Sequence, residues 1–394
     1  MEKRVHILFA VVVTLLVLIS AAWAEDEQWL QYCSARQTGE ILGYMSSWGV
    51  NLSGEKPKGV ELPVFECNEP LFGQWHSPMA KNGQLWIALD RKGKSGPYTR
   101  LFIDSNGDGQ FKDETAVTAY RIEQNQSYFG PVKVVFDSED GPITYHLNFQ
   151  FYNYNERKNL SVTSGCWYEG VITVAGEKKH CVLIDFDVNG TFNDKSVNSG
   201  ESDRVRIGKE GDRDTRFVGN FIEVDGVLYR SEIARDGAYI KLTKSEGVTY
   251  GDVQVPETIT EFAAGGENGL FIRRPEKGTG KLPLGKYSLE HWVIERKDEQ
   301  GRRWKLRCDW GGKFEITKEG QVIKGETILA IGEPVISTLE AKKDKDTYFF
   351  SQAIEGRDGG RIAITCDGGR PRPPKLHISS LDGKYDRTFD FEYG

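Results

Sequence analysis

Two short acidic segments of this 394-residue chain have residue types and a spacing that suit the binding of a divalent cation. One covers residues 104–114 and the other covers residues 185–194. Both read Asp-x-[Asn/Asp]-x-[Asn/Asp]-Gly-x-Phe-x-Asp, and they begin 81 positions apart. Calcium takes about six to eight oxygen ligands, and carboxylates or amides at positions 1, 3 and 5 of a tight loop all point to its inside. The pattern therefore predicts two calcium loops.

Each position of the pattern has its own expected role. The ligands expected at positions 1, 3 and 5 are Asp104, Asn106 and Asp108 in the first loop, and Asp185, Asp187 and Asn189 in the second. Glycine at position 6 permits the left-handed bend that turns the position-7 carbonyl, of Gln110 or Thr191, towards the ion. Phenylalanine at position 8 is expected to anchor each loop to the core beneath it.

The pattern resembles the DxDxDG calcium loops of calmodulin-like (EF-hand) and dockerin-like proteins, with a shorter ending. Those loops are closed by a bidentate Glu at position 12, where this chain has Thr115 and Ser196. The closing carboxylates expected instead are those of Asp113 or Glu114 in the first loop and Asp194 in the second. The second loop has fewer acids and a lysine, Lys195, at position 11, so we expect it to be the weaker site.

Ordinary turns are the alternative to metal loops, because Asn, Asp and Gly are also the common turn residues. Repetition at matched positions favours calcium. Each loop follows an apolar strand pattern, at residues 101–103 or 182–184, rather than a helix. A helix–loop–helix sensor that opens on binding is therefore not expected, and both sites should be structural.

The elements that must position these loops are predicted to be strands. Residues 143–151 alternate apolar and polar side chains over nine positions, which predicts a long strand with one buried face. Segments 221–224, 227–233 and 238–242 are separated by Asp-Gly pairs, which predicts a three-stranded meander. The best helical candidate is a short piece near residues 28–36. The predicted class is all-β and multi-domain, with antiparallel sandwiches and meanders that flank the calcium loops.

Composition shifts predict the domain organisation. We expect a signal peptide at 1–24, an N-terminal segment at 25–78, a β domain with both loops at 79–255, and a C-terminal immunoglobulin-like β-sandwich at 256–394. Residues 282–289 read Leu-Pro-x-Gly-x-Tyr-x-Leu, which resembles the turn and strand of transthyretin-like and Cna-B-like sandwiches. That resemblance implies a sandwich of immunoglobulin type. Alternating Phe389, Phe391 and Tyr393 predict its final core strand.

The N-terminal residues predict export. Lys3 and Arg4 precede the apolar run 7–19, and residues 22–24 read Ala-Trp-Ala, which fits a small-x-small cleavage site. An uncleaved anchor is the alternative, because the uncharged stretch is close to spanning length. We expect a secreted or periplasmic protein with no membrane span after cleavage.

Six cysteines in an export-competent chain permit up to three disulfides. Cys308 and Cys366 both lie on the apolar parity of predicted strands, so both should point inward. A Cys308–Cys366 bridge is the favoured hypothesis, and two reduced core cysteines are the alternative. Side-chain direction does not fix the Cα separation that a disulfide requires.

Charge and motifs exclude several functional classes. With 51 Lys+Arg against 58 Asp+Glu, the net charge of −7 offers no basic excess for contacts with phosphates, so nucleic acid is not an expected partner. The sequence contains no HExxH, Walker loop, GxSxG or Rossmann glycine pattern. Catalytic residues therefore remain unassigned, and whether the protein is an enzyme stays open.

The leading hypothesis is a secreted, calcium-stabilised β protein with a binding or scaffold role towards carbohydrate or a cell-envelope component. Tyr152 and Tyr154, expected on the solvated side of a strand, and Trp167 are candidates for stacking on sugar rings. The alternative is a secreted polysaccharide hydrolase or lyase, whose catalytic acids cannot be recognised by spacing in the sequence. A third hypothesis is an envelope-assembly subunit whose terminal sandwich docks a neighbour.

Overall fold

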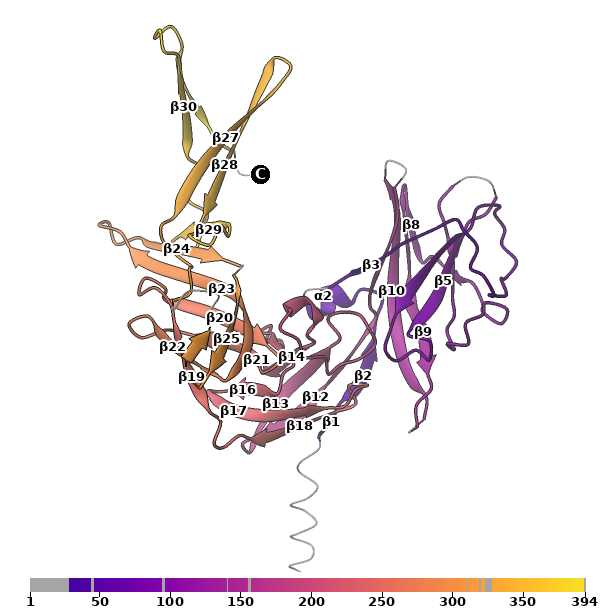
Figure 1. The fold of residues 1–394 in the computed structure, drawn as a ribbon. Helices are drawn as coiled ribbons and strands as arrows, with labels where there is room; N and C mark the ends of the chain where they lie inside the picture. Colours follow the sequence, from indigo (N-terminus) through magenta and orange to yellow (C-terminus); the bar gives the residue numbers. More distant parts are fainter. Residues whose placement is uncertain are drawn as a thin grey trace, which may run out of the picture. The chain divides into compact units, whose positions relative to one another are not determined.

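The computed structural model describes residues 28–43, 46–93, 96–139, 141–154, 157–309, 311–318, 320–322 and 328–392. The chain forms two compact units (Figure 1). One comprises Met1–Val248 with Gly266–Leu270, and the other comprises Thr249–Gly265 with Phe271–Gly394. The predicted signal peptide, residues 1–24, lies outside the described residues.

Antiparallel strands build the first unit. One sheet has the order β4 (Leu71–His76), β5 (Gln84–Asp90), β6 (Arg100–Ile103), β7 (Val117–Thr118). Another has the order β3 (Trp48–Val50), β11 (Arg157–Ser164), β10 (Ile143–Tyr154), β9 (Gln126–Phe136), β8 (Arg121–Glu123). A third has the order β15 (Arg216–Phe217), β14 (Arg204–Gly208), β13 (Glu177–Ile184), β12 (Cys166–Val174), β2 (Gln31–Ser34). The fourth has the order β1 (Gln28–Trp29), β18 (Tyr239–Lys244), β17 (Val227–Ile233), β16 (Phe221–Val224).

The all-β class is confirmed, and so are the long strand and the meander. β16, β17 and β18 pair in chain order, and Gly226 and Gly237 in the two connecting turns have φ values of +76° and +85°. β10 continues to Tyr154, three residues beyond the predicted end, because its ladder with β11 continues to a Tyr154–Arg157 pair. Strand pairing, rather than side-chain alternation, therefore sets where β10 ends.

The helix predicted near residues 28–36 is wrong. The chain there forms β1 and β2, which pair with β18 and β12. The helical segments among the described residues are α2 (Thr38–Leu42) and a 3₁₀ turn, η1 (Ser199–Glu201). No helix in the described part of the chain is long and apolar enough to cross a membrane.

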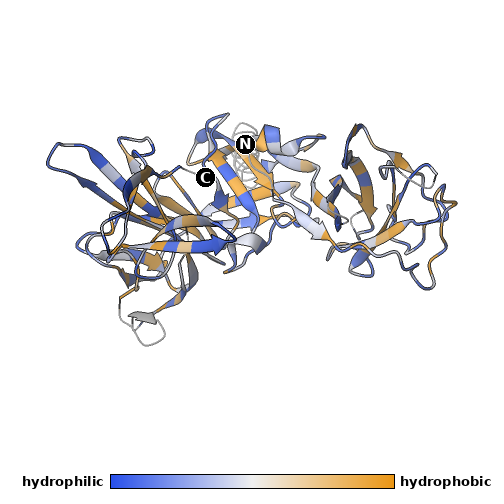
Figure 2. Cartoon of the chain, turned by 90° about the horizontal axis from the view of Figure 1, so that it is seen from above, coloured by the Kyte–Doolittle hydropathy of each residue, from blue (hydrophilic) through white to orange (hydrophobic). Residues whose placement is uncertain are grey.

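Large aromatic side chains fill the core between the sheets of the first unit. Trp75 and Tyr145 are 1 % exposed and stack with their ring centroids 5.7 Å apart. Phe192, from the second acidic loop, packs its ring against that of Tyr145 at 6.2 Å. In Figure 2, hydrophobic residues recur along the strands of both units. The second acidic loop is thus attached directly to the main core.

The second unit holds most of the largest sheet and several hairpins. That sheet has the order β21 (Gly269–Arg273), β20 (Glu261–Gly266), β23 (Gly285–Lys297), β24 (Arg303–Cys308), β29 (Ile362–Cys366), and β25 (Lys313–Thr317) joins β23 to β26 (Gly320–Val322). The two-stranded pairs are β19 (Tyr250–Gln254) with β22 (Thr279–Pro283), β27 (Ile336–Asp344) with β28 (Thr347–Glu355), and β30 (Lys375–Ser379) with β31 (Asp386–Asp390). The immunoglobulin type of this region stays a prediction.

The Cys308–Cys366 bridge is wrong. β24 and β29 pair so that Cys308 lies opposite Ile362, and Cys366 lies opposite Trp304. The two cysteines are therefore four residues apart along the ladder, roughly 13 Å at about 3.3 Å per residue, whereas a disulfide needs Cα atoms within about 7 Å. None of the six cysteines is in a disulfide.

The predicted final core strand is also wrong. β31 ends at Asp390 and pairs with β30 in a two-stranded sheet, and the Phe389 side chain is 42 % exposed. Tyr393 lies outside the described residues. The alternation of apolar residues does not lead to burial here, because a two-stranded hairpin has too few strands to form a core of its own.

Candidate metal centre

The register of two strands brings a third carboxylate to the second acidic loop. β13 and β14 pair with Ile184 opposite Arg204. Asp185 directly follows β13 and Asp203 directly precedes β14, so the two acids lie at the same end of the pair, where residues 185–203 connect the two strands. Asp187 completes the group from inside the loop.

Oxygen atoms of Asp185, Asp187 and Asp203 all lie within 4.8 Å of one another. The side chains of Asp185 and Asp203 are 2 % and 0 % exposed. Among the described residues this is the one set of three His, Cys, Asp or Glu side chains that gathers so closely. Oxygens about 2.3–2.6 Å from a single calcium ion lie at most about 5 Å apart, so the spacing fits a shared divalent cation.

No lysine or arginine of the described residues forms an ion pair with these three carboxylates. Their hydrogen bonds come from neutral donors. The Tyr145 hydroxyl donates to Asp185 Oδ2 at 2.7 Å, and the backbone N–H groups of Phe186 and Asp194 donate to Asp203 at 3.0 and 2.8 Å. Oδ1 of Asp187 is buried without a hydrogen-bond partner. A protein does not normally bury three acids without a cation or protons to neutralise them.

Burial is the largest cause of a raised pKa at all three acids. It raises the pKa of Asp185 to about 6, against a usual value of 3.8. The pKa of Asp187 rises to about 8, because the charges of Asp185 and Asp194 add to the effect of burial. The pKa of Asp203 is raised well above its usual value by burial and by the same neighbours. Protons therefore remain on this group near neutral pH unless a cation displaces them.

The backbone of the second loop has the bend that the pattern predicts. Gly190 has a φ of +94°, and its N–H donates to Asp185 Oδ2 at 2.7 Å. The Thr191 N–H donates to Asn189 Oδ1 at 2.8 Å. Asp194 accepts from the Asn189 amide at 3.0 Å and from the Thr191 hydroxyl. Of the five ligands predicted here, the structure brings Asp185 and Asp187 into the triad, while Asn189, Thr191 and Asp194 bond one another beside it.

The first loop has the same backbone hydrogen bonds. The N–H of Gly109, which has a φ of +82°, donates to Asp104 Oδ2 at 2.9 Å. The Gln110 N–H donates to Asp108 Oδ1 at 2.7 Å. Phe111 is fully buried, as Phe192 nearly is in the second loop. Both position-8 side chains thus anchor their loops as predicted.

The acids of the first loop are less closely gathered. Asp104 is 1 % exposed and its Oδ1 has no hydrogen-bond partner, but among the described residues no two further His, Cys, Asp or Glu side chains place ligand atoms within 4.8 Å of it and of each other. Asp113 accepts a hydrogen bond from the Asn106 amide at 3.0 Å. The Gln110 side-chain oxygen accepts from the Glu61 N–H at 2.6 Å. The sequence predicts that the second loop is the weaker calcium site. Judged by how many carboxylates converge, the second loop is instead the better candidate.

Glu114 occupies in the first loop the place that Asp203 occupies in the second. Each carboxylate accepts the backbone N–H of the position-2 residue, from Ser105 at 2.6 Å and from Phe186 at 3.0 Å. Burial raises the pKa of Glu114, and nearby Asp113 and Asp104 add to the effect. Glu114 was predicted from the sequence, whereas Asp203 was not. The available signal for Asp203 was its position directly before a strand that can form a hairpin with residues 182–184.

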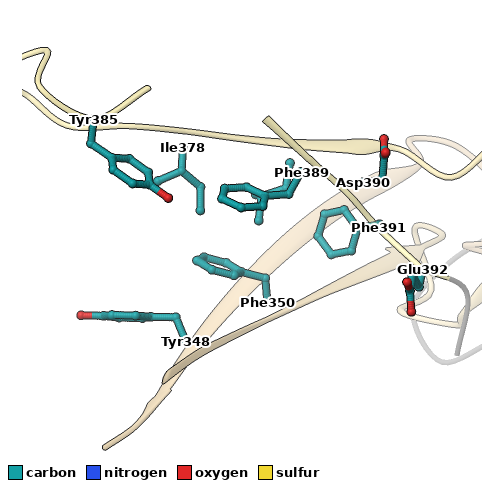
Figure 3. A pocket seen from close by; sticks show the side chains of 9 residues that line it. Tyr348, Phe350, Ile378, Tyr385, Phe389, Asp390, Phe391 and Glu392 are labelled. Carbon is teal, nitrogen blue, oxygen red and sulfur yellow. The ribbon is translucent and has the colours of Figure 1, made fainter. Parts of the chain in front are cut away.

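A cavity of about 740 Å³ lies between the hairpins β27–β28 and β30–β31 in the second unit (Figure 3). Its lining consists mostly of aromatic and aliphatic side chains, with Asp390 and Glu392 at one end (Figure 3). Phe389 and Phe391, predicted for a core strand, line this cavity instead. The lining offers hydrophobic contact but no cluster of metal ligands.

The aromatic residues considered for sugar stacking differ in exposure. Tyr152 and Tyr154 are 37 % and 67 % exposed, as expected for the solvated side of β10. Trp167 is 6 % exposed and is therefore not accessible to a ligand.

No family model, no curated protein and no solved structure matches this chain. The assignment of the site depends on the chemistry of the residues themselves.

Proposed function

We propose that the protein is a calcium-stabilised β protein whose ion is held by Asp185, Asp187 and Asp203. The observation that carries this proposal is the convergence of three carboxylates, two of them fully buried, with no pairing lysine or arginine among the described residues. Oxygen donors alone suit calcium or magnesium, whereas zinc favours histidine and cysteine. An irregular loop suits calcium better than magnesium, because magnesium requires near-ideal octahedral geometry.

The ion would join the end of β13 to the start of β14. It would also order the loop whose Phe192 ring packs against Tyr168 at 5.2 Å and against Tyr145 at 6.2 Å. A cation that binds the native state alone stabilises it by mass action. The expected role of the ion is therefore structural. The first loop, at residues 104–114, is the weaker second candidate for a calcium site.

For the wider role we propose binding or scaffolding outside the cytoplasm, towards carbohydrate or a cell-envelope component. The export-type sequence of residues 1–24 and the exposed Tyr152 and Tyr154 support this proposal. Extracellular calcium near millimolar would fill loops with dissociation constants of about 10⁻⁴–10⁻³ M. The alternative is a secreted polysaccharide hydrolase or lyase, which a panel of cleavage assays would reveal and which a glycan array alone would not.

Thermal melting of the purified protein tests the calcium proposal. We expect the melting midpoint to be higher in CaCl₂ than in EDTA, and the increase over EDTA to be smaller in MgCl₂. The variant carrying Asp185→Asn and Asp203→Asn should lose most of that rise. Asp225→Asn is the matched control, because Asp225 lies in an exposed turn with a φ of +49° that Asn tolerates. A midpoint that is the same in EDTA and in calcium would contradict the proposal.

A further inference from the structure

A small pocket of about 280 Å³ in the first unit brings two arginines together. Arg36 comes from the segment between β2 and α2, and Arg121 comes from β8. Other lining side chains are Glu40, Tyr120, Tyr128 and Gln150. The volume is close to the lower end of small-molecule sites, about 300–1,000 Å³, and so suits a ligand of about one ring.

Each guanidinium is held over an aromatic ring. The Arg36 guanidinium carbon lies 4.8 Å from the Tyr120 ring centroid, and that of Arg121 lies 3.7 Å from the Tyr128 ring centroid. Gln150 supports this arrangement, because its amide donates to the Tyr128 hydroxyl at 3.2 Å. Stacking fixes the plane of a guanidinium and leaves its N–H edges able to bind a ligand.

The Arg36 guanidinium keeps its donors, whereas that of Arg121 shares part of its own with Tyr128 and Glu123. Arg36 forms no hydrogen bond or ion pair with any of the described residues. The ion pair of Arg121 is a 3.4 Å contact with Glu123, in which both side chains are about half exposed. Both cations act on the Tyr120 hydroxyl, where they oppose the rise in pKa that burial causes. Both positively charged side chains line the same pocket.

We infer that this pocket binds an acidic sugar, with its oxyanion between Arg36 and Arg121 and a ring hydroxyl on Glu40. The arginine fork matches carboxylate and phosphate oxygens, and a carboxylate such as Glu40 accepts hydrogen bonds from hydroxyl groups. A simple inorganic anion has no ring hydroxyl to place on Glu40, and its charge would be repelled by that carboxylate. The chemistry is shared by uronates and sugar phosphates. This inference deepens the proposed carbohydrate role and rests on it, but it is independent of calcium.

Calorimetric titration of the purified protein tests the inference in 50 mM NaCl, with CaCl₂ and separately with EDTA. The probes are D-galacturonate, D-galactose 6-phosphate, neutral D-galactose and inorganic phosphate. We expect at least one of the two charged sugars to bind at least tenfold more tightly than galactose and than inorganic phosphate. The tighter of the two identifies the oxyanion. Affinity should fall in 500 mM NaCl, because salt screens exposed charges.

Arg36→Ala should weaken binding of the preferred charged sugar by roughly 10–100-fold, the usual effect of losing a charge-assisted hydrogen bond. Its melting midpoint should fall only slightly, because Arg36 is exposed and the variant loses the stack on Tyr120 but no hydrogen bond with the described residues. Arg157→Ala, at an exposed arginine of β11, is the control with the same loss of charge and should bind normally.

Equal binding of the preferred charged sugar by wild type and Arg36→Ala, or affinities for both charged sugars no higher than that for galactose, would overturn the inference. If a glycan array then still shows binding, the carbohydrate role stands without this pocket. If the wild-type protein binds no sugar in either assay, both the pocket and the carbohydrate role fall.

Discussion

The two acidic loops have the same backbone conformation but different surroundings for their acids. In both, the position-1 carboxylate accepts the position-6 glycine N–H, and the position-5 side chain accepts the position-7 N–H. In the first loop the carboxylate that caps position 2 is Glu114, from the loop itself, and in the second it is Asp203, from the partner strand. The local motif thus determines the loop, whereas strand register determines how many acids converge on it.

Position 3 shows the same difference. Asn106 uses its amide to donate to Asp113 in the first loop, whereas Asp187 keeps a buried oxygen without a partner in the second. An amide can satisfy a neighbouring carboxylate without a metal, but a third carboxylate cannot. The second loop therefore requires a cation or protons, and the first loop requires them less.

The largest effect should come from Asp203→Ala. In calcium we expect the free energy of unfolding to fall by about 2–6 kcal/mol, because two backbone N–H donors lose their acceptor at about 1–3 kcal/mol each, apart from any lost metal ligand. Denaturant melts in CaCl₂ measure this change. Glu114→Ala is the matched change in the first loop and should cost less, because Ser105 is half-buried. Equal losses of unfolding free energy in Asp203→Ala and Glu114→Ala would show that the two loops depend equally on their capping carboxylates.

A change of pH should separate the metal-free from the calcium-bound protein. The pKa values of Asp185 and Asp187, about 6 and about 8, exceed the usual 3.8. The folded chain then binds more protons than the unfolded chain, so stability is fully present below about pH 4 and is lost as the pH rises through 6 and 8. Melts in EDTA should therefore show a loss of roughly 2–4 kcal/mol from pH 5 to 8, after allowance for the partial exposure of Asp187.

Calcium should oppose this loss, because the metal binds the deprotonated carboxylates. The difference between the melting midpoints in CaCl₂ and in EDTA should therefore grow as the pH rises. The variant Asp187→Asn removes an acid whose pKa is raised to about 8 and should flatten the pH dependence in EDTA. A wild-type profile in EDTA that is already flat would show that these acids are not buried together.

Local patterns in the sequence predicted the strands and turns well. The Asp-Gly turns on either side of β17 and the alternation along β10 depend on neighbouring residues, so a single sequence contains them. The same holds for the bend at Gly109 and Gly190 and for the burial of the phenylalanine that follows two residues later.

Features that depend on distant pairing were not predicted. Asp203 reaches the metal centre through the β13–β14 register, and Cys308 is separated from Cys366 by the β24–β29 register. Residues 28–34 became strands because β12 and β18 have edges for them to pair with. In each case the strand that pairs with the segment is distant in the sequence. The local residue pattern therefore does not identify it.

A smaller effect should distinguish the loops at position 4, where Gly107 has a φ of +72° and Val188 a φ of +58°. A Cβ at Gly107 would meet Leu85 at 3.6 Å, an ordinary contact, so Gly107→Ala should cost about 1–2 kcal/mol through backbone strain alone. Val188→Gly removes a similar strain while it loses a buried side chain. Val205, in β14, is equally buried and serves as the control. Denaturant melts should show that Val188→Gly lowers the free energy of unfolding by at least about 1 kcal/mol less than Val205→Gly does.

The smallest effect should come from Lys195, which the sequence suggested would weaken the second loop. It occupies position 11, where the first loop has the capping Glu114, but its Nζ donates to Asn220 Oδ1 at 3.4 Å rather than to the acids. Burial lowers the pKa of Lys195. Lys195→Gln should therefore change the calcium dissociation constant, measured by calorimetry, by less than about twofold, because a lysine that makes no direct ion pair with the acids contributes little. A tenfold gain in calcium affinity would instead show that Lys195 competes with the ion. The affinity of the second loop would then be set by a residue of the loop itself rather than by Asp203 from the neighbouring strand.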